Sequence, residues 1–228
     1  MPLHRPAIAA GARASLPVLL GVVPFGLITG VAMVASGIPP AIAVLMSLFV
    51  FAGASMVAAA QLLAHGTPAA LVILAALFIN LRFMMYSASI RTHLAHLPLG
   101  WRLAASYLHT DNVYGLSLAR FAEHPEDPHK LEYFLGAGLL IWATWQAAVL
   151  AGALIGAGVP AAWRLEFAAP LAFIAMTVPL LRDRAMVGAA LAAAATVVAT
   201  SGLPLRLNLV AAAAAGIVAG MLLERRGR

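Results

Sequence analysis

Residues 14–64 read ASLPVLLGVVPFGLITGVAMVASGIPPAIAVLMSLFVFAGASMVAAAQLLA, and this stretch contains no Asp, Glu, Lys, Arg or His. At a rise of about 1.5 Å per residue, one helix of that length would extend roughly 77 Å, or two crossings of a hydrocarbon core about 30 Å thick. Pro39 and Pro40 divide the stretch, because proline cannot continue a helix. The stretch therefore predicts that the chain begins with membrane helices.

The composition of the whole chain points the same way. Of 228 residues, 63% are apolar and 10% are charged, whereas soluble domains average about 25% charged residues. So few charges cannot cover a soluble protein of this size, which excludes a soluble enzyme, a secreted disulfide scaffold and a disordered tail. The chain has no cysteine for disulfide or thiolate chemistry. Its net charge of +6 comes from scattered arginines, which is typical of topology signals rather than of nucleic-acid binding.

Further apolar runs follow, and prolines, glycines or charges punctuate their boundaries. Lipid leaves only helices or closed barrels, and these runs are too long for barrel strands. We therefore expect an all-α, polytopic membrane helix bundle of seven or eight segments, forming a single domain over residues 1–228. The runs lie at residues 68–90, 133–159, 167–181, 185–201 and 207–223.

Residues 102–121 decide between seven and eight segments. They match one membrane thickness, but a polar group, His109-Thr110-Asp111-Asn112, lies at their centre. Such a segment can cross as a broken helix, enter and return, or lie on the surface. The distribution of arginines places the C-terminus in the cytoplasm with either count. We expect a crossing helix interrupted near Asp111, followed by a polar loop over residues 122–132.

Short motifs recur along the chain. Gly26-x-x-x-Gly30 is similar to Gly152-x-x-x-Gly156, and residues 36–40 are similar to residues 157–161. Duplicated halves are common in secondary transporters, and here they would be residues 14–122 and 133–228. Chance is the alternative, because Gly, Ala, Leu and Pro dominate the composition.

Polar residues collect in the C-terminal half of the segment at 68–90. Arg82, Tyr86 and Ser89 share one helix face, and Asn80 and Ser87 form a neighbouring stripe. Arg82 alone would be explained by a side chain that reaches the lipid headgroups. Its polar neighbours favour an interior polar face instead, because a polar group in a bilayer has no water to satisfy it.

Glycine and proline indicate broken helices at two places. Gly53 lies between small residues, which permits either close helix packing or a break in the helix. Pro24, followed by Gly26, lies in the middle of the first segment, and Pro170 and Pro179 lie in the fifth. Broken helices build solute sites, in which free backbone amides face carboxylates and free carbonyls face cations.

Three runs carry a family resemblance. Residues 24–27, 46–55 and 80–89 resemble the AzlC-type family. Thr110-Asp111, the segment around Trp142 and Trp145, and the segment ending Pro179-Leu180-Leu181 also resemble it, in the same order. That family comprises large subunits of two-component branched-chain amino-acid exporters. The resemblance implies an inner-membrane secondary transporter that exports branched-chain or similar hydrophobic amino acids together with a small AzlD-like membrane subunit.

Three positions depart from the family pattern. Met56 stands where the family commonly has glutamine, Phe83 where it often has histidine, and Asn112 where it commonly has an acid. The transporter class is unaffected, whereas the substrate and the coupling ion depend on such polar positions.

The predicted site joins these features. We expect the amides at residues 53–55, with Asn80, to hold a substrate carboxylate, and Met84 to join an apolar wall. Asp111 is expected to approach Arg82 and to couple a proton gradient to export, with Thr110 beside it and His109 as an accessory; the alternative is that Asp111 only caps a half-helix. The substrate-pathway residues are Pro24, Phe25, Gly26, Phe51, Gly53, Ala54, Ser55, Met56, Asn80, Arg82, Tyr86, Ser87 and Ser89.

Other function classes have weaker support. A transporter of another small solute or of a metal ion would draw on His93 and His96, which have no carboxylate beside them. A membrane hydrolase would need a nucleophile or zinc motif, and the chain has neither Gly-x-Ser-x-Gly nor His-Glu-x-x-His. A non-transporting membrane scaffold would not require a polar helix face. The chain also lacks an ATP-binding P-loop, so we expect the energy to come from a gradient or from a partner subunit. We expect no enzyme activity and no cofactor.

Overall fold

The computed structural model describes residues 3–158, 183–200 and 207–227, and every regular element in these ranges is a helix. The all-α prediction is therefore confirmed. The chain divides into two compact units, Met1–Phe173 and Ile174–Arg228. The segment expected at residues 167–181, with its two prolines, lies outside the described residues.

Three helical stretches of the first unit are long and apolar enough to cross a membrane, counting only the described residues. The first is almost continuous, because a 3-10 turn joins two α-helices and Pro24 lies inside the second helix without ending it. The three stretches are Arg5–Ala35, made of α1 (Arg5–Ser15), η1 (Leu16–Val18) and α2 (Leu19–Ala35); α5 (Ala69–Leu94); and α8 (Lys130–Gly158).

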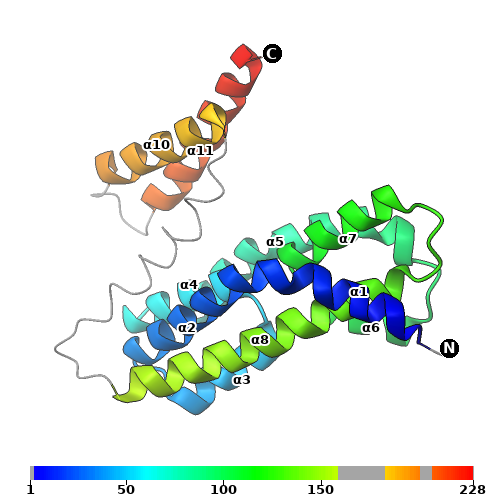
Figure 1. The fold of residues 1–228 in the computed structure, drawn as a ribbon. Coiled ribbons are helices and arrows are strands. Elements are labelled where there is room, and N and C mark those ends of the chain that lie inside the picture. The colour runs from blue at the N-terminus through cyan, green and yellow to red at the C-terminus, as the bar shows by residue number, and fades with distance from the viewer. Residues whose placement is uncertain (1–2, 159–182, 201–206, 228) are drawn as a thin grey trace. The chain divides into compact units, whose positions relative to one another are not determined.

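The second apolar run forms a helical hairpin, and each of its two helices is shorter than the three long apolar stretches. It consists of α3 (Pro40–Val50) and α4 (Gly53–Ala64), with 11 and 12 residues. Each arm extends about 17 Å, little more than half of the hydrocarbon core. Phe51, with a left-handed φ of 41°, turns the chain between the arms. We call residues 40–64 the first hairpin; it leaves from and returns to the end of the unit at which α5 begins (Figure 1).

Residues 99–123 form a second hairpin of the same kind, made of α6 (Leu99–Tyr107) and α7 (Asp111–Glu123). The last turn of α5 and the first turn of α8 lie together, because Lys130 Nζ is 3.4 Å from His93 Nδ1. Short connections to these two helices keep both ends of the second hairpin at this end of the unit. The expected break near Asp111 is present, but the chain reverses direction there, whereas the two halves of a broken crossing helix would continue in one direction.

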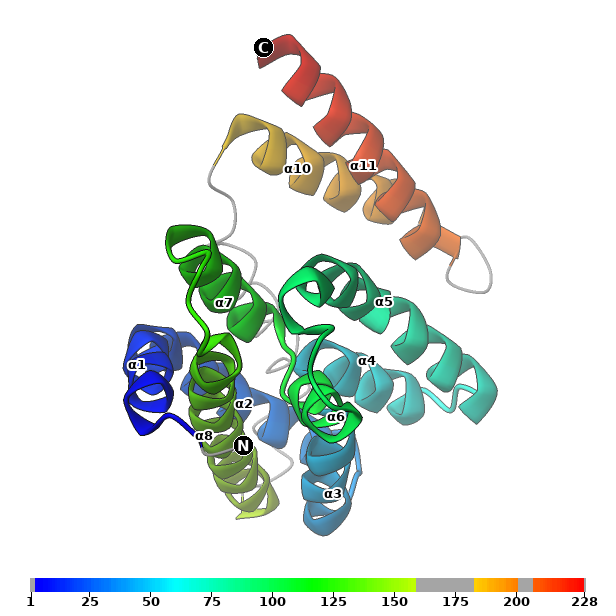
Figure 2. The same cartoon turned by 90° about the vertical axis from the view of Figure 1, so that its right-hand side faces the viewer.

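Glycines bring α8 against α1 and α2, and the three helices run side by side in both views (Figures 1 and 2). A Cβ added to Gly30 would lie 2.6 Å from the Ala153 nitrogen, and one added to Gly152 would meet the Leu27 carbonyl. The two recurring Gly-x-x-x-Gly motifs therefore pack against each other, as small residues do at close helix contacts. The duplication of the two halves stays a prediction.

The second unit contains α10 (Arg184–Ala199) and α11 (Leu207–Gly227), which confirms helices near 185–201 and 207–223. Asp183 caps α10, since its Oδ1 accepts a hydrogen bond from the Met186 amide at 2.7 Å. The pair packs closely through small residues: a Cβ on Gly216 would lie 3.2 Å from the Ala189 carbonyl oxygen.

Candidate functional site at the two hairpin tips

The tips of the two hairpins meet inside the first unit. Tyr107, the last residue of α6, donates its hydroxyl hydrogen bond to the carbonyl oxygen of Leu48 at 2.5 Å. The rings of Phe51 and Tyr107 lie 6.2 Å apart between centroids. Both helix breaks therefore lie close together, although they are more than 50 residues apart in the sequence.

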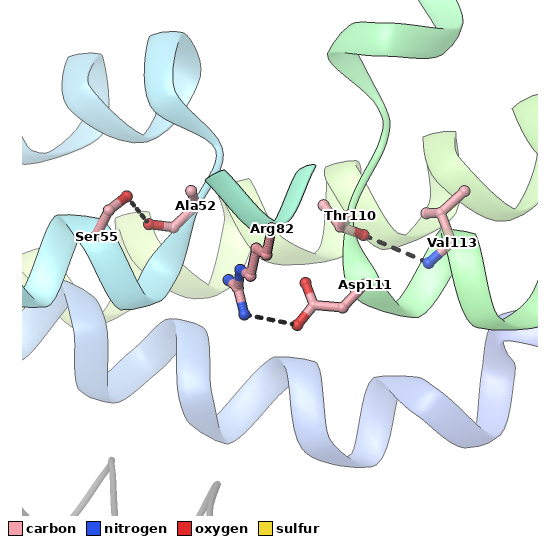
Figure 3. Close-up of polar contacts among 6 residues, drawn as sticks. All are labelled: Ala52, Ser55, Arg82, Thr110, Asp111 and Val113. Carbon is pink, nitrogen blue, oxygen red and sulfur yellow. Dashed lines mark hydrogen bonds and ion pairs between the residues drawn. The ribbon is translucent and has the colours of Figure 1, made fainter. Parts of the chain in front are cut away.

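The first break leaves the N-terminus of α4 without a side-chain cap. Ala52 occupies the cap position and carries no polar side chain. The Ser55 hydroxyl instead donates to the Ala52 carbonyl at 2.9 Å, as Figure 3 shows. The first amides of a helix have no partner within the helix, and together with the helix dipole they attract an anion. The break at Gly53 expected from the sequence is therefore present.

Asn80 lies beside this N-terminus. Its Nδ2 donates to the Ser55 hydroxyl at 3.2 Å, whereas its Oδ1 is buried without a hydrogen-bond partner in the described part of the chain. Asn80 therefore joins α5 to the start of α4, as the sequence predicted. Its Oδ1 can still accept a hydrogen bond at the site.

Arg82 and Asp111 form an ion pair between the two breaks, with Arg82 Nη1 3.2 Å from Asp111 Oδ2 (Figure 3). Their expected approach is confirmed. The side chains are 29% and 49% exposed, so the pair is not sealed within this unit. Thr110, not Asp111, caps α7, because its Oγ1 accepts a hydrogen bond from the Val113 amide at 3.5 Å. The interpretation of Asp111 as the cap is therefore wrong, and its carboxylate forms an ion pair with Arg82 instead.

Aromatic rings surround the second break. His109 is 8% exposed, and its ring stacks near those of Tyr86 and Tyr114, at 6.2 and 6.0 Å between centroids. Tyr114 also donates to the Ser89 hydroxyl at 3.1 Å. His109 Nε2 is buried and has no hydrogen-bond partner in the residues described. Tyr86 and Ser89 therefore join the polar cluster, as predicted.

Some predicted residues lie elsewhere. Met84 is 69% exposed and does not belong to an apolar wall, and Ser87 is exposed on the same helix. Pro24 is also exposed. A Cβ on Gly26 would lie 2.7 Å from the Ala148 side chain, so this glycine serves helix packing.

The remaining apolar residues do gather at the first break. The rings of Phe25 and Phe51 lie 5.5 and 6.5 Å from Trp145. A Cβ on Gly53 would lie 2.6 Å from Phe25 and would collide with Trp145. Met56 is 1% exposed on the same half-helix.

A polar network that connects α3 and α6 to α8 was not predicted from the sequence. Trp145 Nε1 donates to the Ser47 hydroxyl at 2.9 Å, and this hydroxyl donates to Gln146 Oε1 at 2.8 Å. Gln146 Nε2 donates to the Ser47 carbonyl at 3.2 Å, and Trp142 Nε1 donates to the Tyr107 hydroxyl at 2.9 Å. The available signal was the spacing of positions 142, 145 and 146, which places three polar groups on one face of an apolar helix.

The polar loop expected at 122–132 is shorter than predicted, because Glu132 lies on α8 and is 1% exposed. Its Oε1 is 3.7 Å from His129 Nδ1. Asp127 remains in the loop and accepts hydrogen bonds from the His129 amide at 2.9 Å and from Arg120 at 3.3 Å. The His129 amide, followed by the Arg120 guanidinium, lowers the pKa of Asp127 below its ordinary value.

The described residues contain no group of three His, Asp or Glu side chains that could hold a metal ion. His93, named for the metal alternative, lies beside the Lys130 ammonium and against the Phe121 ring, at 5.0 Å between centroids.

A family model described as "AzlC protein" matches residues 17–159. This match includes α2, α5, both hairpins and α8, and therefore all the residues of the candidate site. No curated protein and no solved structure matches the chain.

Proposed function

Because this chain belongs to the AzlC family, which is a family of membrane transport proteins, we propose that it exports branched-chain or similar hydrophobic amino acids across the inner membrane. A small AzlD-like membrane subunit is the proposed partner, and the basic C-terminus lies in the cytoplasm. No ATP-binding motif is present in the sequence, so an ion gradient supplies the energy.

One observation carries the proposal: an uncapped helix N-terminus, Asn80 and a carboxylate–guanidinium pair lie together at the hairpin tips. An amino acid presents a carboxylate, an ammonium group and a side chain. The first-turn amides at residues 53–55 bind the carboxylate, with Asn80 as an additional donor. The three chemical groups of the substrate therefore have counterparts in one place.

Asp111 is the proposed counterpart of the positive charge. Its carboxylate pairs with Arg82 at 3.2 Å and is half exposed, so a proton or a substrate ammonium can compete with the guanidinium. Removal of one partner of an ion pair without replacement is costly, because it leaves an uncompensated charge. Exchange of Arg82 for another cation at Asp111 would couple ion movement to export, with His109 as an accessory.

The apolar side chain of the substrate fits the aromatic side of the first break, where Phe25 and Phe51 contact Trp145. A methylene contributes only about 1–3 kcal/mol to discrimination in an apolar pocket. Selectivity among leucine, isoleucine, valine and methionine is accordingly loose.

The experiment is efflux of labelled leucine, valine and methionine from loaded proteoliposomes that contain the chain and its small subunit. Leucine efflux is expected to be saturable and to be inhibited by the other two amino acids. A chain that is correctly inserted, carries its subunit and releases none of the three faster than empty vesicles would contradict the proposal and leave a scaffold function or another solute.

A further inference from the structure

One face of α8 contacts both hairpins at their tips. Trp142, Trp145 and Gln146, which we call the α8 polar face, follow the spacing i, i+3, i+4. Trp145 and Gln146 bind Ser47 in the last turn of α3. Trp142 binds the hydroxyl of Tyr107 at the end of α6. One rigid helix of 29 residues therefore contacts the two arms that end at the breaks.

These contacts satisfy groups that a broken helix leaves unpaired. The last four carbonyls of a helix have no partner within the helix, and a membrane interior has no water to supply one. At the end of α3, Tyr107 donates to the Leu48 carbonyl, and Gln146 donates a second hydrogen bond to the Ser47 carbonyl, which already accepts one from the Phe51 amide. The end of α3 is thus held by side chains, whereas the start of α4 has no side-chain cap.

The Ser47 carbonyl also controls the turn between α3 and α4. It accepts a hydrogen bond from the Phe51 amide at 3.1 Å as well as from Gln146. Phe51 has a φ of 41°, a left-handed conformation that a non-glycine residue keeps only when its surroundings hold it. Gln146 therefore binds the same carbonyl as the Phe51 amide, and the turn at Phe51 sets the direction of α4.

We propose that the α8 polar face positions the tip of the first hairpin, and that Gln146 is a positioning residue for the amides of α4. This inference rests on the proposed function for its effect on transport, but not for its effect on the tip itself. Without Gln146, the tip adopts more than one conformation. Only the fraction of molecules in which the α4 amides are correctly placed then binds substrate. Apparent affinity falls in proportion to that fraction.

The first test compares Gln146→Leu with Gln61→Leu, which makes the same chemical change on α4 at a side chain outside the network. In proteoliposomes with the small subunit, Gln146→Leu is expected to raise the KM for leucine about tenfold, the effect of one lost hydrogen bond, with Vmax within about twofold of wild type. Ser47→Ala should raise the KM for leucine less, because Gln146 still donates to the carbonyl of residue 47. The effects of the two substitutions on KM should be non-additive. An unchanged KM in Gln146→Leu would overturn the inference.

The second test does not depend on transport. Spin labels on cysteines at Phe49 and Leu103, which are 82% and 61% exposed, report the distance between α3 and α6, and the chain has no native cysteine to interfere. The distance distribution should be narrow in the wild-type background and with Gln61→Leu, and broad with Gln146→Leu. A narrow distribution in Gln146→Leu refutes the positioning role. A broad distribution, combined with a wild-type chain that transports no amino acid, supports the positioning of the tip and contradicts the proposed function.

Discussion

Gly53 and Asp111 each begin a half-helix, and the two differ in how their first turns are occupied. At Asp111 the Thr110 hydroxyl caps the helix and the carboxylate pairs with Arg82. At Gly53 the cap position is an alanine, and Asn80 stands beside the first turn. The first helix start therefore keeps its amides free of a side-chain cap, whereas the second is capped and carries an ion pair.

Gly53→Val is predicted to abolish transport while the protein still inserts. A Cβ at this position would lie 2.6 Å from Phe25 and would collide with Trp145, so either the start of α4 or the two rings must shift. Gly21→Val is the matched control, because no atom lies within 4 Å of a Cβ placed there. Efflux of labelled leucine, normalised to the amount of inserted protein, measures the difference. Normal efflux by Gly53→Val would rule out a carboxylate site at this break.

Asp111→Asn is predicted to lower the rate of export, because a neutral amide cannot form an ion pair with Arg82 or with a substrate cation. Asparagine keeps the shape of aspartate but cannot take up or release a proton, and Thr110 still caps α7. Efflux is measured from pH 5.5 to pH 8, with Asn112→Ala as the control on the exposed neighbouring position. Full export with the wild-type pH profile would exclude Asp111 from coupling.

At the scale of elements, the close pairing of α2 with α8 is the main structural support of the site. It carries Phe25 from α2 and Trp145 from α8 to the first break, and their rings lie 5.5 Å apart. The approach depends on glycines at which a side chain would strike backbone atoms of the other helix.

Gly30→Leu is therefore predicted to destabilise the protein by more than the roughly 1–3 kcal/mol typical of overpacked cores, because backbone atoms cannot move aside as side chains do. A Cβ there would lie 2.6 Å from the Ala153 nitrogen. Thermal unfolding in detergent measures the loss of stability. Gly21→Leu, on the open side of the same helix, should cause only a small loss. Equal stability of the two variants would contradict the packing.

The connection between α7 and α8 should respond to acid. Because its pKa is lowered in the folded protein, by the His129 amide first and by Arg120, Asp127 contributes stability that is complete above the ordinary carboxyl pKa of about 4. This contribution is lost as the pH falls through the folded value. Asp127→Asn should weaken the fall in unfolding temperature below pH 4, whereas Glu126→Gln on the exposed neighbour should not. The same acid response in both variants would exclude this role of Asp127.

The sequence predicted the position of both breaks but not the direction of the chain after them. Gly53 and the polar group at residues 109–112 marked the places, since glycine is a poor helix former and polar groups are costly inside an apolar membrane helix. Apolar composition reports that a residue avoids water, and it is the same whether the chain crosses or turns back. The turn itself is made by Phe51, a residue type with no preference for a left-handed φ.

Burial of polar residues was predictable where it follows from local spacing and not where it follows from tertiary packing. Arg82 and Asn80 stood out because they interrupt an apolar run. Glu132 looked like part of a polar loop because its neighbours in sequence are charged, yet it is 1% exposed on α8. Ser47 and Gln146 meet across 99 positions, a distance over which no pattern within one segment gives information.

The first unit as a whole consists of three long helices and two hairpins whose tips meet. The long helices are Arg5–Ala35, α5 and α8. The hairpins enter from opposite ends (Figure 1), and their tips meet where Tyr107 donates a hydrogen bond to the Leu48 carbonyl. In the proposed export function, movement of one hairpin at a time would open the meeting point of the tips to one side and then to the other.

Cysteine labelling from the two sides of the membrane tests this arrangement most directly, because the chain contains no native cysteine. Single cysteines are placed in the four connections, at Ser36, His65, His96 and Glu126, and exposed to a membrane-impermeant maleimide in oriented vesicles. We predict that Ser36 and His65 react from one side, and that His96 and Glu126 both react from the other. Reaction of Ser36 and His65 from opposite sides, or of His96 and Glu126 from opposite sides, would show that the corresponding hairpin crosses the membrane and would contradict the account.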